Sequence, residues 1–559
     1  MRRIEQKQYI GLIATVLRGI DKINTAGSEA AAVILSECLR AFAAVEEAVC
    51  RSVSDSRRQA YHENTNSIKK AIEALAAGMD AGGDSIGFCI QDVRDSIEKL
   101  KQEILDEAEI QYVVLFLPYK ASMWDSMESV WLCAQDDPCC ITYVAPIPYF
   151  DKNSDGSFGE MHYEGNQMPD YVDVADCSVL DLGQLMPDVI YIHNPYDQYN
   201  HVTSVHPAFY SAELKKYTQM LVYVPYSIPG VYESAEGAAS FCQTSGMYRA
   251  DVIIAQSQVH KMLLAANGHR EEKIAVLGNP KFDYVFRHLK DCRIPDEMKF
   301  IGQEKNDGLC IGKRQERTVG QKEDTDCEMT ADQEEAADGR WTAGSGNTSG
   351  RKKVFLVCIS VGSYLLWENI IEMYDMFIGC LLDQYHATVI YRPHPLLETT
   401  IKSMRPHKYK QYMEFLDKYC GRADFVLDLM SDYMPAVCAS DCMIGDYSSL
   451  CFSYAVTGKP AAMVIWGTSP ASNLYYAFDY REIYFINVGP FLAWNQLPED
   501  FEKFAADMVN GHDHKRRHRL ESFRHSVANL DGTCGEKIHA YVMERIQNRQ
   551  ENKSFQNEA

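Results

Sequence analysis

The chain alternates, over most of its length, between short apolar runs and longer stretches of mixed polarity. From residue 112 the apolar runs are YVVLFLPY, CITYVAPIP, DVIYIHNP, MLVYVPYS, DVIIAQS and KIAVLGNP, separated by stretches long enough for a helix or a large loop. Continuous apolar runs of this length are typical of strands that a parallel sheet buries on both faces. The pattern therefore predicts an α/β domain over residues 107–302.

The same alternation returns after residue 352. The runs KVFLVCIS, HATVIYRPHP, DFVLD, CMIGD, PAAMVIW and YFINV are predicted strands, and LLWENIIEMYDMFIGCLLDQY, HKYKQYMEFLDKYC and SLCFSYAVTG are predicted helices. We expect a second α/β domain over residues 353–548, followed by a tail over 549–559. Its C-terminal part is predicted to be helical and is free to cross back over the first domain.

Two segments lack this alternation of apolar runs and stretches of mixed polarity. Residues 1–106 carry apolar positions at helical spacing, as in AAAVILSECLRAFAAVEEAV, and predict a helical region for oligomerisation, partner docking or packing on the next domain. Residues 303–352 are highly charged and poor in apolar residues, which predicts a disordered polar linker or insertion. The predicted fold class is α/β: two Rossmann-type domains with parallel sheets, preceded by a helical region, with a cleft between the domains.

Composition narrows the functional classes. The formal net charge of −23 argues against nucleic acid as a partner and requires local cations for any anionic substrate. The 18 cysteines form no regular framework, and no apolar run reaches the roughly 20 residues of a membrane-spanning helix, so a cytoplasmic setting is expected. Because Cys438 and Cys442 lack a second ligand pair, we expect no metal site, and no cofactor motif is present.

Polar residues follow one of the predicted strands of the second domain at the turn Asp446 to Ser449. A buried strand ends at Gly445, and the next helix starts near Ser448. The first N–H groups of a helix lack intrahelical partners and carry partial positive charge, so Ser448, Ser449 and these amides suit a phosphate. The alternative is that Asp446 and Ser448 only cap the helix in a tight turn.

A second polar strand end lies in VIYRPHPLLE. His394 sits between two prolines, which hold an extended turn and keep this histidine out of a helix. An oriented imidazole there suits phosphate binding or proton transfer, with Arg392 as a nearby cation. The alternative is a histidine that only bonds the backbone. We expect both turns at neighbouring strand ends of one sheet.

Together these motifs resemble the CDP-glycerol glycerophosphotransferase family of teichoic-acid primases and polymerases. The resemblance covers about residues 185–470 and rests on YRPHP, on SDCMIGDYSSLCFSYAVTGKPA, and on the weaker segments VLGNPKFDYV and ADVIIAQSQ. It implies a GT-B fold whose second domain holds the activated donor. It also implies that His394, Ser448 and Ser449 contact the donor phosphates, with Asp446 orienting the turn or touching the donor.

One departure from the family concerns the general base. The family's Trp-His-Gly-Thr-Pro-Leu-Lys-like segment, which carries the histidine base, is replaced here by YVPYSIPGVYE, without His or Lys. His193, at a strand end beside Asp197, is the substitute candidate. Its alternative is a hydrogen-bonded core or loop histidine.

The leading functional hypothesis is transfer of a glycerophosphate-like group from a CDP-linked donor to a hydroxyl acceptor, lipid-linked or not, in cell-envelope polymer synthesis. The alternatives are a GT-B glycosyltransferase or epimerase that uses a nucleotide-sugar, and an inactive nucleotide-binding scaffold. The basic segment HDHKRRHRLESFRH has two interpretations: peripheral contact with the inner membrane face, or a helix face exposed to solvent. A homo-oligomer through the N-terminal helices stays open as well.

Overall fold

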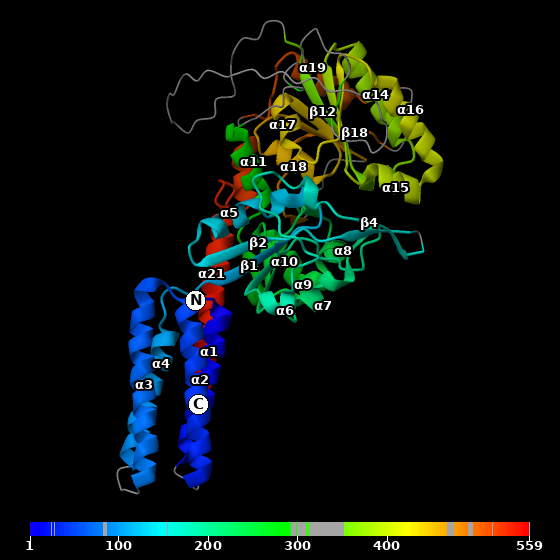
Figure 1. Ribbon diagram of the computed structural model, residues 1–559. Coiled ribbons are helices and arrows are strands. Elements are labelled where there is room, and N and C mark those ends of the chain that lie inside the picture. Colours follow the sequence, from blue (N-terminus) through cyan, green and yellow to red (C-terminus); the bar gives the residue numbers. More distant parts are fainter. Residues whose placement is uncertain are drawn as a thin grey trace, which may run out of the picture.

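The computed structural model describes residues 1–23, 25–26, 28–81, 86–153, 155–291, 298, 309–311, 351–466, 475–489, 496–516 and 518–557. Figure 1 shows a helical N-terminal region and two α/β domains, stacked one above the other in that order. The fold class predicted from the sequence is confirmed.

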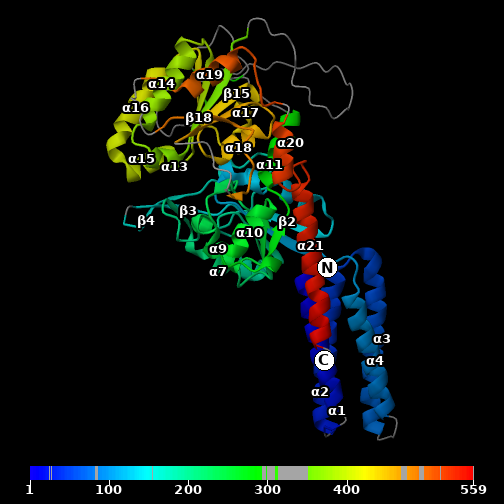
Figure 2. The same cartoon turned by 180° about the vertical axis from the view of Figure 1, so that it is seen from behind.

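The N-terminal region is a bundle of four helices, α1 (Arg3–Ile23), α2 (Ser28–Ser52), α3 (Asp55–Ala81) and α4 (Ile86–Leu105). In the bundle α1 packs against α2 and α4, and α3 packs against the same two helices. The apolar face of each helix supplies a shared core. Figures 1 and 2 show the bundle projecting away from the two α/β domains. It is attached at its start, where buried Arg3 pairs with Asp188 of the first domain at 3.5 Å.

The first domain is built on a sheet of six parallel strands. Their spatial order is β2 (Cys140–Val144), β1 (Tyr112–Leu117), β5 (Val189–Ile192), β7 (Met220–Tyr223), β9 (Val252–Ala255) and β10 (Ile274–Val276). The connections reverse direction between β1 and β5, which opens a crevice at the carboxyl ends of these two strands. Its helices are α5 (Glu128–Asp136), α6 (Leu182–Leu185), α7 (Ser211–Leu214), α8 (Ala239–Cys242), α9 (Ser245–Arg249), α10 (Gln258–Ala266) and α11 (Pro280–Asp291).

The second domain has a seven-stranded parallel sheet. The spatial order is β11 (Leu309–Ile311), β14 (Phe425–Asp428), β13 (Thr388–Pro393), β12 (Val354–Ile359), β15 (Cys442–Gly445), β16 (Ala461–Ile465) and β18 (Tyr484–Asn487). Here the order reverses between β12 and β15. Its helices are α13 (Val361–Leu366), α14 (Ile370–Asp383), α15 (Leu397–Met404), α16 (Tyr409–Tyr419), α17 (Met434–Ala439), α18 (Ser449–Ala455), α19 (Glu499–Val509) and α20 (Arg519–Ser526).

Several elements differ from the sequence prediction. The helix expected over LLWENIIEMYDMFIGCLLDQY is two helices, α13 and α14, because the backbone is extended at Trp367. Three polar strands form a small antiparallel sheet that apolar patterning does not reveal: β3 (Tyr149–Lys152), β4 (Phe158–His162) and β6 (Thr203–Val205). Leu309–Ile311, inside the predicted linker, pairs with β14 as the edge strand β11. Residues 303–308 and 312–350 of that prediction lie outside the described residues.

Two elements connect the domains in addition to the segment between α11 and β12. The loop after β7 ends in β8 (Val231–Tyr232), which pairs with β17 (Tyr475–Tyr476) of the second domain. The last helix, α21 (Cys534–Asn557), returns along the first domain and packs against α5. Figures 1 and 2 show α21 in red beside that domain. Its buried face contributes Ile538, Val542 and Ile546 to the core under the first sheet, so this helix crosses back over the first domain.

Candidate functional site

A cleft with a volume of about 590 Å³ lies between the two α/β domains. Strand ends of both sheets open into it, as expected for facing Rossmann-type domains. The first domain contributes Lys120, the loop 225–232 and Lys281, and the second contributes the turns that hold Ser360, His394, Ser448 and Ser449. The cleft thus brings together four of the six site residues predicted from the sequence: Arg392, His394, Ser448 and Ser449.

The strand ends that carry these turns are not neighbours, contrary to our expectation. β12 lies between β13 and β15, so the β12–α13 turn separates His394 from the turn of Ser448. This middle turn connects the other two. The N–H of His394 donates to the carbonyl of Ile359 at 3.4 Å, and the N–H of Ser360 donates to Asp446 at 2.7 Å. Sequence reasoning missed Ser360, although it directly follows a predicted strand.

Asp446 is fully buried and holds the central turn. Its carboxylate accepts a hydrogen bond from the N–H of Ser360. From the sequence we expected Asp446 either to orient the turn or to touch the CDP-linked donor. Burial raises the pKa of Asp446, and the hydrogen bond from the Ser360 N–H opposes that rise. The structure therefore gives Asp446 a positioning role: it fixes the β12 and β15 ends relative to each other.

The two serines are engaged by backbone donors. Ser448 is the N-cap of α18 and accepts the N–H of Cys451 at 3.4 Å, as in the capping alternative. Ser449 reaches across the cleft and accepts the N–H of Ile228 at 3.0 Å. Because each hydroxyl acts as an acceptor in these bonds, its own hydrogen can still be donated to a ligand.

The two ring nitrogens of His394 differ in their hydrogen bonds. Its Nδ1 accepts the N–H of Leu396 at 3.1 Å, so the hydrogen of the neutral ring is on Nε2. Among the described residues none accepts a hydrogen bond from this Nε2–H. Burial, helped by the charges of Lys120 and Arg392, lowers the pKa of His394 to about 4. At neutral pH the side chain is therefore a neutral donor on the wall of the cleft.

Arg392 lines the cleft, but protein oxygens use its guanidinium. One terminal nitrogen donates to the buried Asp428 at 2.6 Å and to the carbonyl of Asp432 at 3.1 Å. The other donates to the carbonyls of Met430 and Ser431. Arg392 thus holds the loop after β14 in place.

His193, the candidate base, is a core histidine. It is fully buried, its Nε2 accepts the N–H of Tyr119 at 3.1 Å, and its Nδ1 lies 3.0 Å from the hydroxyl of Ser126. Burial, with a contribution from Lys281, lowers the pKa of His193 to about 3. It does not line the cleft, and both nitrogens hold the β1 and β5 ends together, as in the core-histidine alternative.

The segment that replaces the family's histidine motif forms the wall opposite Ser449. Beyond the Ile228 contact, the N–H of Val231 donates to the hydroxyl of Tyr447 at 2.6 Å, and the carbonyl of Gly230 accepts the N–H of Ala477 at 2.7 Å. A side chain at position 230 would run into the Tyr447 hydroxyl, which explains the glycine there. This segment therefore contributes domain contacts and contains neither histidine nor lysine.

Two buried lysines of the first domain occupy the cleft, and sequence reasoning missed both. Lys281 follows Pro280 at the start of α11 and pairs with the buried Asp125. Lys120 follows β1 at the point where the strand order of the first sheet reverses. The signal for Lys120 was its place directly after a predicted strand, in YVVLFLPYK.

Lys120 belongs to a small hydrogen-bonded cluster. Its ammonium donates to the hydroxyl of Tyr149 at 2.6 Å and to the carboxylate of Glu164 at 3.3 Å, and Tyr149 donates to the same carboxylate at 2.6 Å. Burial lowers the pKa of Lys120, although the charge of Glu164 opposes this. A lysine in this environment is disposed to exchange a proton.

The basic segment over residues 512–525 is partly structural. Arg519 is fully buried and its guanidinium binds Asp513 at 2.7 Å, while Lys515 donates to the carbonyl of Arg481. Exposed positions include His514 and Arg516. Among the described residues, no helix is both long enough and apolar enough to cross a bilayer.

Comparison with known proteins gives three findings. The model of the family described as CDP-Glycerol:Poly(glycerophosphate) glycerophosphotransferase matches residues 370–543. A search of curated proteins found no match. Among solved structures, the chain is similar to the wall teichoic acid polymerase TagF, with 13% identity, 83% of this chain and 96% of that chain covered, and a TM-score of 0.45. It is also similar to MnaA of S. aureus with UDP, with 13% identity, 78% and 97% coverage, and a TM-score of 0.44.

The family match runs from α14 to α21 and contains His394, Asp446, Ser448 and Ser449. It includes the two stronger motifs on which the resemblance in the sequence rested, while the two weaker segments lie outside it. Residues 370–543, which form most of the second α/β domain, are therefore similar to the CDP-glycerol glycerophosphotransferase family.

Proposed function

We propose that the protein transfers a glycerophosphate group from CDP-glycerol, or a closely related CDP-linked donor, to a hydroxyl acceptor. The observation that carries this proposal is the cleft, where donor groups from His394, Ser448 and Ser449 face Lys120 and Lys281 of the first domain. A diphosphate is the ligand that suits such a set, because its oxygens accept hydrogen bonds and the ammonium of Lys281 supplies positive charge beside it.

In the proposed reaction the acceptor oxygen attacks the phosphorus that carries glycerol. A new P–O bond forms to the acceptor, and the P–O bond to the cytidine monophosphate moiety breaks. CMP leaves with the bond's electron pair, and its charge is stabilised by the Nε2–H of His394 and by the serine hydroxyls. The acceptor proton must go to a base on the first-domain side.

Lys120 is the base that we assign. It lines the cleft, its amine has a lowered pKa, and Glu164 and Tyr149 hold it in place and can share the incoming proton. Histidine is absent from the segment that carries the base in the family, so a base from the β1 end replaces one from the β7 end. The acceptor, lipid-linked or not, would enter from this side of the cleft.

The first experiment measures CMP release from CDP-glycerol with the wild type and with His394→Asn. Loss of one charge-stabilising donor should cut turnover by about 100-fold to 1,000-fold. His386→Asn is the matched control, because His386 is an exposed histidine at the opposite end of β13. Equal turnover in the two variants would refute the role of His394. CMP or UMP release from nucleotide-sugars but not from CDP-glycerol would favour the glycosyltransferase alternative.

The role of Lys120 is tested by Lys120→Arg and Lys120→Met. Arginine keeps the positive charge but does not release its proton in proteins, so a base role predicts that both variants lose turnover. The pH profile of kcat should also lose its rising limb in any residual activity of Lys120→Arg. Near-normal turnover of Lys120→Arg, with loss in Lys120→Met only, would show that the charge alone is needed.

Peripheral contact with an anionic membrane is part of the proposal, through exposed positions near α20 such as His514 and Arg516. Sedimentation with vesicles of anionic lipid tests it, and Arg516→Ser should lower the bound fraction. Equal binding to neutral vesicles, or none to either, would remove this part and leave the transferase assignment untouched.

A further inference from the structure

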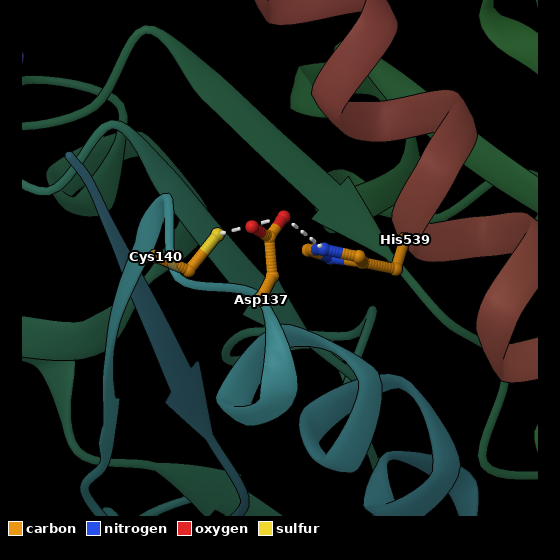
Figure 3. A group of neighbouring side chains, drawn as sticks. All are labelled: Asp137, Cys140 and His539. Carbon is orange, nitrogen blue, oxygen red and sulfur yellow. Dashed lines mark hydrogen bonds and ion pairs between the residues drawn. The ribbon is translucent and has the colours of Figure 1, made fainter. Parts of the chain in front are cut away.

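A second cluster of reactive side chains lies outside the cleft, where α21 packs on the first domain. Asp137 follows the end of α5, Cys140 starts β2, and His539 projects from α21. Figure 3 shows the carboxylate of Asp137 between the thiol of Cys140 and the ring of His539. Their ligand atoms all lie within 4.8 Å of one another, and each side chain is buried or half-buried.

The distances within the cluster suit a tetrahedral metal ion. Zn²⁺ bonds of about 2.0 Å to nitrogen or oxygen and about 2.3 Å to sulfur place neighbouring ligand atoms roughly 3.3 to 3.8 Å apart. The Sγ of Cys140 is 3.7 Å from the Oδ2 of Asp137, which fits without movement. The Nε2 of His539 is 2.9 Å from the same oxygen and has to move by only about half an ångström.

Met543 closes one side of the cluster. It lies one helical turn after His539 on α21, so both side chains project from the same face of the helix. Its sulfur is 3.8 Å from the Sγ of Cys140. The thioether and the neighbouring core shield the cluster from water on this side, while Asp137 and His539 leave access from the surface.

Charge also favours a divalent cation. A thiolate from Cys140 and the carboxylate of Asp137 supply two negative charges, and neutral His539 supplies a nitrogen. Together they balance Zn²⁺, and binding releases the thiol proton and any proton held between Asp137 and His539. Carboxylate, thiolate and imidazole are the three ligand types that zinc takes in proteins.

We propose that Asp137, Cys140 and His539 form a zinc site that fastens the C-terminal helix α21 to the first α/β domain. From the sequence we expected no metal site, because Cys438 and Cys442 lack a second ligand pair. Asp137 and Cys140 are three residues apart, but His539 follows about 400 residues later and joins them only through the fold. The three side chains leave the fourth tetrahedral position to a water molecule on the surface side, and the site lies apart from the residues that line the cleft.

The test uses the full-length protein, stripped with a chelator and titrated with ZnCl₂ against a chromophoric competitor. We expect one tight equivalent in the wild type, and its loss in Cys140→Ser and in His539→Gln. The matched controls are Cys133→Ser, a half-buried cysteine on α5, and His525→Gln, an exposed histidine on α20; both should keep the equivalent.

Two further readouts keep the test decisive if a variant folds poorly. Co²⁺ in the wild type should give a thiolate-to-cobalt charge-transfer band, and zinc should raise the thermal unfolding midpoint of the wild type more than that of Cys140→Ser. Absence of the band and of a zinc-dependent midpoint shift in the wild type would overturn the proposal and leave a hydrogen-bonded triad. Preference for Cu⁺ over Zn²⁺ would overturn the assignment to zinc.

Discussion

Two histidines at strand ends have opposite roles in this molecule, and hydrogen bonds decide which is which. His193 uses both ring nitrogens to hold backbone and side chains of the first domain. His394 uses only Nδ1, and its Nε2–H faces the cleft wall without a partner among the described residues. The sequence presents both residues after apolar strands, and only the fold of the following loops separates a core histidine from one that lines the cleft.

The buried state of His193 has a consequence for acid stability. Its pKa of about 3 in the folded protein lies below the value of about 6.5 for an unfolded chain. The unfolded chain therefore binds the extra proton first, and stability present above about pH 6.5 is lost as the pH falls. Between about pH 7 and about pH 5, the free energy of unfolding measured in urea should fall by about 2 kcal/mol more in the wild type than in His193→Asn. The exposed control His525→Asn should follow the wild type; an unchanged acid dependence in His193→Asn would contradict the burial.

Arg392 gives a second prediction at this scale. Its pair with Asp428 is buried, and removing one partner leaves an uncompensated carboxylate together with three unpaired carbonyl groups. Arg392→Met should therefore lower the free energy of unfolding by about 3 to 5 kcal/mol. Arg422→Met removes a half-exposed pair with Asp424 and should cost less than about 1 kcal/mol. Similar urea midpoints for both variants would show that Arg392 is not the support described.

At the scale of elements, the site is formed by turns that follow three strands of one sheet. The strands themselves could be predicted from apolar runs, as could the start of α18 at Ser448. The order of the strands could not be predicted, because it depends on which strand edges pair in the folded sheet. In the observed order, β12 and the turn of Ser360 lie between the two predicted turns. Lys120 was missed for a related reason: its chemistry depends on Tyr149 and Glu164, from the small polar sheet and a following loop.

The contact between the loop 225–232 and the turn of Tyr447 is open to a test by overpacking. A methyl group at position 230 would meet the Tyr447 hydroxyl and the Phe452 ring, so Gly230→Ala should move the loop away from Ser449. We expect a loss of about 1 to 3 kcal/mol in stability and a weaker affinity for the donor. Gly237→Ala, where the nearest atom is 3.6 Å away, is the control. Wild-type donor affinity and stability in Gly230→Ala would disprove this close contact.

At the scale of the whole molecule, the C-terminal helix joins parts of the chain that the domain order separates. The amphipathic pattern near the C-terminus predicted a helix, but only the fold shows that its apolar side completes the core under the first sheet. Glycine at position 535 permits this, because a side chain there would strike the backbone of Ser129. The helical N-terminal region was predicted as helix, and its four-helix arrangement emerged from the packing of its apolar faces.

Packing of α21 predicts coupling between the domains. Ile538 is fully buried against the first domain although it follows the second domain in the chain. Ile538→Ala should lower stability by about 2 to 5 kcal/mol, because it leaves a cavity in the core of the first domain. Glu544→Ala, on the exposed side of the same helix, should leave the thermal unfolding midpoint nearly unchanged. Equal midpoints in the two variants would contradict the docking of α21.

The most direct measurement is a crystal structure of the full-length protein soaked with CDP-glycerol. The diphosphate is expected in the cleft between the domains, within hydrogen-bonding distance of the Nε2 of His394 and of the hydroxyl of Ser448 or Ser449, with the glycerol side toward Lys120. Electron density for the donor at any other place, or an occupied cleft in which His394 does not touch a phosphate oxygen, would contradict the account.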